Sequence, residues 1–131
     1  MDKTTFIKKR EAMPRQPLGN CHDGEGALDW IVVLDRSNPN DGSLNFLHDD
    51  ILAPGVSIGL HKHTDDEEYY YIVSGTGVMT LDQERVEVKA GDITAVFPGG
   101  EHGLENTGSE DLRIIVISVT PRPKKIASDI S

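Results

Sequence analysis

Three histidines and one glutamate have the types and spacing of a metal site. His61 and His63 are separated by one residue, Glu68 follows five positions later, and His102 lies in a later segment. On an extended strand, residues two apart point to the same face, so His61 and His63 share a face. Imidazole and carboxylate donors suit manganese, iron, cobalt, nickel, copper and zinc. We therefore predict that these four side chains converge on one divalent transition metal.

The number of ligands in this site indicates chemistry rather than a closed structural role. Four protein donors around an octahedral ion leave two positions open to water, dioxygen or a substrate, as at catalytic metals. Two other interpretations stay open. The histidines could line the interior and hydrogen-bond Glu68 without a metal, or the site could bind a metal weakly and do no chemistry.

The segment that holds the first three of these residues resembles the first signature of the cupin family. That signature runs glycine, five residues, His-x-His, three or four residues, glutamate, six residues, glycine. This chain fits it at Gly55, His61, His63, Glu68 and Gly75. The final glycine also selects Glu68 over the adjacent acid as the ligand, because only Glu68 has the required interval to Gly75.

A second segment resembles the second cupin signature, in which a glycine precedes the histidine by eleven positions and an asparagine follows it by four. Gly91, His102 and Asn106 fit that spacing. The chain departs from the family at Pro98, which falls one position later than the usual proline, so the local turn is expected to differ while His102 keeps its place. The resemblance covers roughly residues 44–119.

The resemblance implies a fold and a range of functions. It implies an all-β, single-domain, double-stranded β-helix or jelly-roll barrel. Within the family, the chain is similar to small oxalate-decarboxylase-like proteins with one cupin domain, through HDGEG (residues 22–26), PGVSIGLHKH (54–63) and GGEHGLENTG (99–108). That similarity implies manganese and a small chelating dicarboxylate. The alternatives are a ferrous dioxygenase acting on a small bidentate substrate, and a non-catalytic module that binds a sugar or metabolite.

The apolar pattern of the chain predicts the strands that such a site needs. Short runs with alternating or β-branched residues are separated by glycine-rich and polar turns, which is typical of a β-sandwich or barrel. The expected strands cover residues 28–34, 44–53, 56–63, 68–74, 78–81, 86–89, 93–97, 102–106 and 112–119. The last of these is almost continuously apolar and is therefore expected to be buried on both faces.

Two further side chains are candidates for proton transfer. Tyr70 shares the face of Glu68 by strand alternation, and Glu101 precedes His102 at the expected mouth of the pocket. A core role for Tyr70 is the alternative. His48 is expected to line the same pocket. His22 lies in a glycine turn, where a surface histidine is the first interpretation and a fifth metal ligand the second.

Composition limits the partners of the chain. It has 131 residues, a formal net charge of -9 and 37% hydrophobic residues. These values predict a globular protein and disfavour nucleic acid or an anionic membrane as a partner, leaving a small-molecule substrate. The single cysteine, Cys21, excludes an intrachain disulfide and fits a cytoplasmic location. There is no apolar run of membrane-spanning length.

The ends of the chain are expected to lie outside the barrel. We predict an N-terminal arm over residues 1–20, with a short strand near Phe6 and Ile7, a barrel over residues 21–120 and a flexible tail over residues 121–131. Tyr69, Tyr71 and Val73 share the outward face of their strand and are too apolar for water. The sequence therefore predicts a homodimer.

Overall fold

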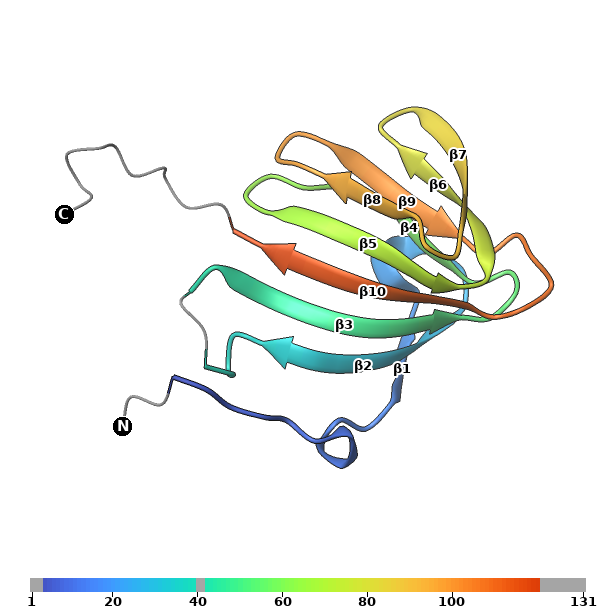
Figure 1. The fold of residues 1–131 in the computed structure, drawn as a ribbon. Coiled ribbons are helices and arrows are strands. Elements are labelled where there is room, and N and C mark those ends of the chain that lie inside the picture. Colours follow the sequence, from blue (N-terminus) through green and yellow to red (C-terminus); the bar gives the residue numbers. More distant parts are fainter. Residues whose placement is uncertain (1–3, 40–41, 121–131) are drawn as a thin grey trace, which may run out of the picture.

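Two antiparallel β-sheets face each other and form the molecule (Figure 1). The computed structural model describes residues 4–39 and 42–120. In this part of the chain the helical elements are two short 3₁₀ turns, η1 (Arg10–Ala12) and η2 (Cys21–Asp23). No helix among these residues has the length and apolarity needed to cross a membrane. The all-β class predicted from the sequence is confirmed.

The larger sheet has six strands and the smaller has four. In spatial order the larger sheet contains β1 (Gln16–Gly19), β2 (Ala27–Asp35), β3 (Leu44–Leu52), β10 (Leu112–Val119), β5 (Glu67–Ser74) and β8 (Ile93–Val96). The smaller contains β4 (Ser57–Lys62), β9 (Glu101–Glu105), β6 (Thr76–Leu81) and β7 (Glu84–Lys89). All nine predicted strands are present, and β1 is an additional one.

The hydrophobic core lies between the sheets, because alternate residues of each strand point inward. Leu52, Ile72 and Ile114 of the larger sheet meet Met79 and Leu104 of the smaller, and each of the five is at most 2% exposed. Burying a side chain of this size stabilises the fold by roughly 1.5–3 kcal/mol. The core holds the two sheets in a fixed relation, which is what a site built from both of them requires.

The N-terminal arm differs from the prediction in where it forms a strand. Phe6 and Ile7 are 50% and 75% exposed and belong to no strand. Strand β1 instead forms at Gln16–Gly19 and pairs with β2, whose edge is otherwise open. The predicted tail, residues 121–131, lies outside the described residues.

Strand β10 is not buried on both faces, contrary to the prediction. It lies between β3 and β5, with Leu112, Ile114 and Val116 buried. On the opposite face Arg113 is exposed and Ile115 and Ile117 are half-buried. The outward face of the larger sheet therefore has no second layer within the described chain, and its apolar residues are only partly covered by their neighbours.

Candidate metal centre

Each predicted ligand is placed by a strand or by a strand end. His61 is on β4, His63 follows the last residue of β4, Glu68 is on β5 and His102 is on β9. Strands β4 and β9 are neighbours, and their register sets His61 directly opposite His102. The backbone of His63 makes two hydrogen bonds with the 97–100 turn. The N–H of Gly99 donates to His63 O, and the N–H of His63 donates to Gly100 O.

The four side chains meet at one point, as the spacing predicted. Nε2 of His102 lies 3.1 Å from Nε2 of His63, 3.0 Å from Nε2 of His61 and 2.9 Å from Oε1 of Glu68. One donor atom from each residue lies within 4.8 Å of all the others. Metal–ligand bonds of about 2.1 Å at right angles separate neighbouring donors by about 3 Å. The cluster could therefore hold a metal ion.

The contacts of the outer ring nitrogens explain why the Nε2 atoms turn inward. Nδ1 of His61 lies 2.7 Å from Gly59 O, and Nδ1 of His63 lies 2.9 Å from Oδ1 of Asp66. Both oxygens accept, so both Nδ1 atoms carry the proton and both Nε2 lone pairs face the cluster, where they are free to bind a cation. This arrangement favours metal binding over a cluster held by hydrogen bonds alone.

Glu68 supplies negative charge to the cluster at all ordinary pH values. It is 5% exposed. Burial alone would raise its pKa, but hydrogen bonding to His102 and His61, with the charges of His102 and His63, lowers the pKa of Glu68 to about 2. Glu67, the acid not chosen as ligand, points away and accepts a 3.0 Å hydrogen bond from the Tyr69 hydroxyl.

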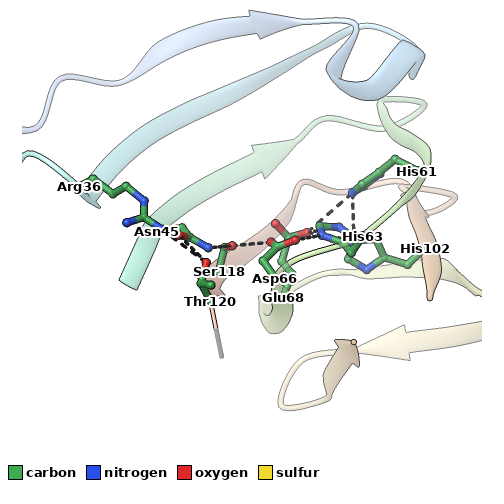
Figure 2. A network of polar contacts seen from close by, with 9 residues as sticks. All are labelled: Arg36, Asn45, His61, His63, Asp66, Glu68, His102, Ser118 and Thr120. Carbon is green, nitrogen blue, oxygen red and sulfur yellow. Dashed lines mark hydrogen bonds and ion pairs between the residues drawn. The ribbon is translucent and has the colours of Figure 1, made fainter. Parts of the chain in front are cut away.

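A chain of hydrogen bonds leads from His63 to the end of the larger sheet (Figure 2). The Ser118 hydroxyl donates to Oδ2 of Asp66 at 2.6 Å, and Asn45 donates to Ser118 at 3.0 Å. Burial alone would raise the pKa of Asp66, but the hydrogen bonds of Ser118 and His63 lower it. A carboxylate that accepts from a ligating histidine fixes the orientation of the ring and raises its basicity.

His22 is exposed, as expected of a histidine in a surface turn, but it also lies against the cluster. Its ring stacks on that of His61, with centroids 3.6 Å apart and planes at 9°. The side chain is not one of the four converging ligands. The stack depends on close backbone packing, since a Cβ on Gly59 would lie 1.9 Å from His22 O and one on Gly24 2.2 Å from Ser57 O. His22 has a φ of 50°, which is uncommon for a residue with a side chain.

A cavity of about 220 Å³, partly open to solvent, adjoins the cluster. Glu68, Tyr70 and His48 line it, as expected from strand alternation. The Tyr70 ring is 2% exposed and lies 4.7 Å from the ring of His102, centroid to centroid. Burial and the charge of Glu68 raise the pKa of Tyr70 well above its usual value, so the hydroxyl stays protonated.

Sequence reasoning missed a second carboxyl group in this cavity. Asp50 lines it and is 3% exposed. The available signal was alternation along β3, which puts Phe46, His48, Asp50 and Leu52 on one inward face. Cys21 lines the same cavity, and burial with the charges of Asp50 and Glu68 raises its pKa to about 11.

Glu101 is not brought to this cavity. It precedes His102 on β9, so alternation turns its side chain to the opposite face. Its backbone N–H donates to Oδ1 of Asp82 at 3.0 Å. It lines a different cavity together with Phe97 and Pro98, and none of the four cluster residues lines that one.

Comparison with known proteins gives a consistent set of similarities. Residues 50–118 match the family model described as a cupin domain. The chain is 32% identical over 113 residues to the oxalate-binding protein of Thermotoga maritima, covering 86% of this chain and 92% of that protein. It is 39% identical over 95 residues to an uncharacterised protein of Methanocaldococcus jannaschii, covering 71% and 76%.

Solved structures show the same architecture. A crystal structure described as a predicted oxalate decarboxylase from Thermotoga maritima superposes with a TM-score of 0.82 at 28% identity, covering 88% of this chain and 100% of that one. The jelly-roll barrel expected from the two signatures is therefore confirmed.

Proposed function

The chain belongs to the cupin family, and on this premise we propose that it binds one divalent transition metal and acts on a small carboxylate that chelates it. The observation that carries the proposal is the convergence of His61, His63, Glu68 and His102 beside a cavity of about 220 Å³. Four ligands leave positions open for a bidentate anion, which the cavity can admit. The name of the Thermotoga relative, an oxalate-binding protein, supports a dicarboxylate of this size.

The bound metal would hold the carboxylate and polarise it as a Lewis acid. Manganese is the first expectation and ferrous iron the second. The three histidines and Glu68 would hold that ion, and Phe46, Ile58 and Val116 form an apolar part of the cavity wall beside it. Tyr70 is the proposed residue for orienting the substrate or donating a proton, because it is buried, protonated and adjacent to His102. Glu101 stays a weaker proposal, because it lines a different cavity.

Metal content and turnover test this proposal together. Wild type and His102→Ala are compared by elemental analysis and with oxalate, small keto acids and catechols, under manganese and under ferrous iron with oxygen. We expect one metal per chain in wild type, metal-dependent turnover of a carboxylate, and loss of both in the variant. His48→Ala, a histidine outside the cluster, is the control for metal content.

The alternatives give different results in the same experiment. Iron as the bound metal with oxygen-dependent turnover would favour a dioxygenase. A ligand that raises the melting temperature equally with and without metal, and no turnover, would replace the proposal with a binding module. Full activity in His102→Ala would rule out a metal-centred reaction.

The proposal extends to partners and location. A net charge of -9 supports a small-molecule partner over nucleic acid or membrane. The single free cysteine supports a reducing cytoplasm. The exposed apolar residues on the outward face of β5 and β8 support a homodimer.

A further inference from the structure

The cavity beside the cluster is lined by a carboxyl group with one oxygen that nothing in the described chain satisfies. Asp50 is 3% exposed, and its buried Oδ1 has no hydrogen-bond partner. Arg15, the cation whose charge reaches it, instead lies 3.6 Å from Asp49 and donates to Asp29 O. Buried polar groups in proteins are almost always hydrogen-bonded. An unsatisfied one that lines a cavity therefore points to a ligand.

The surroundings of Asp50 determine which form of the carboxyl group meets that ligand. Burial and the charge of Asp49 raise the pKa of Asp50 to about 8, so at neutral pH it is a carboxylic acid with an O–H to donate. Burial also lowers the pKa of His48 to about 4, so this neighbour is neutral. Among the described residues that line the cavity, none is lysine or arginine.

A chelating carboxylate would bring unpaired oxygen atoms into these surroundings. Glu68 belongs both to the cluster and to the cavity wall, so a ligand on the metal extends into the cavity. Its oxygens that do not ligate the metal then lose water and need a donor. Apolar residues such as Phe46, Ile58 and Val116 cannot supply one. The acid form of Asp50 can, in addition to the Tyr70 hydroxyl that lines the same cavity.

Resting on the proposed function, we propose that Asp50 determines specificity in this site by donating a hydrogen bond to a carboxylate oxygen that does not ligate the metal. This role selects short carboxylates that carry acceptor oxygens at both ends. After bidentate chelation oxalate presents a free oxygen to Asp50 in either orientation, whereas pyruvate presents one only when its carboxylate end faces Asp50 and a methyl group when the other end does. The site should therefore prefer oxalate, and Asp50 should account for the preference.

Calorimetric titration of the manganese-loaded protein with oxalate and with pyruvate tests the role. Asp50→Asn keeps a donor in the same place, and Asp50→Leu removes it at similar volume. We expect Asp50→Leu to weaken oxalate binding by about ten- to a hundredfold, as for a lost hydrogen bond to a charged group, and to reduce the preference over pyruvate. Asp50→Asn should stay within about threefold of wild type. Glu87→Gln, which changes an exposed carboxylate of β7 that lines a different cavity, is the control.

The outcomes separate this inference from the proposed function. Unchanged oxalate affinity in Asp50→Leu overturns the role of Asp50 while leaving metal-centred carboxylate binding in place. Equal losses in Asp50→Asn and Asp50→Leu overturn the role as a donor. If manganese-loaded wild type binds neither probe, the proposed function fails, and this inference fails with it. Asp50→Ala replaces Asp50→Leu if the latter does not fold.

Discussion

Nδ1 of His63 lies 2.9 Å from Oδ1 of Asp66, and the Ser118 hydroxyl donates to the other oxygen of that carboxylate at 2.6 Å. The two bonds join a predicted ligand on the β4 side of the site to a strand of the larger sheet. They orient the imidazole so that Nε2 faces the cluster. The orientation of this ligand therefore depends on residues that do not touch the metal site.

We predict that Asp66→Asn weakens metal binding by about ten- to a hundredfold, as is usual when a ligating histidine loses its carboxylate partner. Ser118→Ala should act in the same direction and more weakly, because Asp66 stays charged. Competition with a chelating dye measures the affinity. Asp65→Asn removes an exposed carboxylate one residue away and should bind metal as wild type does. Equal affinities in Asp66→Asn and Asp65→Asn would contradict the prediction.

Asp50 should make the protein less stable as the pH rises. Its folded pKa of about 8 exceeds the usual value of 3.8, so between these values the folded state holds a proton that the unfolded state releases. The free energy of unfolding then falls from pH 4 to pH 8. We expect Asp50→Asn to stabilise the metal-free protein at pH 8 by on the order of a few kcal/mol, and far less at pH 4.5. Urea unfolding at both pH values measures this.

Asp49 gives a control of opposite sign. The hydrogen bond of Arg113, with that residue's charge, lowers the pKa of Asp49. The stabilisation of the fold by ionised Asp49 is therefore present above the pKa that Asp49 has in the unfolded chain. It is lost as the pH falls through the lower pKa that Asp49 has in the folded protein. Asp49→Asn should destabilise the protein at pH 8 by about 1 kcal/mol, as for a partly exposed ion pair. Parallel behaviour of the two variants would show that the cavity does not hold Asp50 protonated.

The close packing of the 21–24 turn on β4 should tolerate no side chain at Gly59. A Cβ there would lie 1.9 Å from the carbonyl oxygen of His22, so the turn must move and the stack on His61 must open. We expect Gly59→Ala to lower the free energy of unfolding by about 1–3 kcal/mol, as for other overpacked sites. Gly19→Ala, where nothing lies within 4 Å, should leave it nearly unchanged. Equal unfolding curves for the two variants would contradict this account.

The strands could be predicted from local alternation, and the cluster of three histidines and Glu68 from the spacing of two family signatures. Glu68, Tyr70 and Ile72 are buried on one face of β5, as their spacing requires. The two histidine segments are far apart in the chain, yet the two matching signatures were enough to predict that His61 and His102 lie close together. Features that follow from the two-residue period of a strand, or from the spacing of a family signature, can be predicted from the sequence.

Contacts between elements could not be predicted in this way. Asp50 is an acid on an otherwise apolar face, and only the packing of the sheets shows that it is buried without a partner. The stack of His22 on His61 depends on two glycines that allow backbones to touch, which no periodicity reveals. The outward faces of β5 and β10 were predicted to be buried only because their residues are apolar. No element of the described chain covers these faces.

The outward face of β5 and β8 leads to the last prediction, a homodimer. Tyr71 and Val73 are 45% and 37% exposed, and Ile93, which lies opposite Tyr71 in the register, is 61% exposed. Phe97 extends this surface and is 55% exposed. Apolar residues grouped at the open edge of a sheet are typical of an interface between subunits.

Light scattering of wild type at micromolar concentration should give twice the 14.4 kDa mass of one chain. Ile93→Glu should give the monomer mass, because each copy in a dimer would bury an unpaired charge. Residue 93 is exposed in the single chain, so the substitution should leave the fold intact. Val86→Glu makes the same change at an apolar residue 40% exposed on the smaller sheet and should remain dimeric. A wild-type mass near 14.4 kDa would rule the dimer out, and monomers in both variants would place the interface elsewhere.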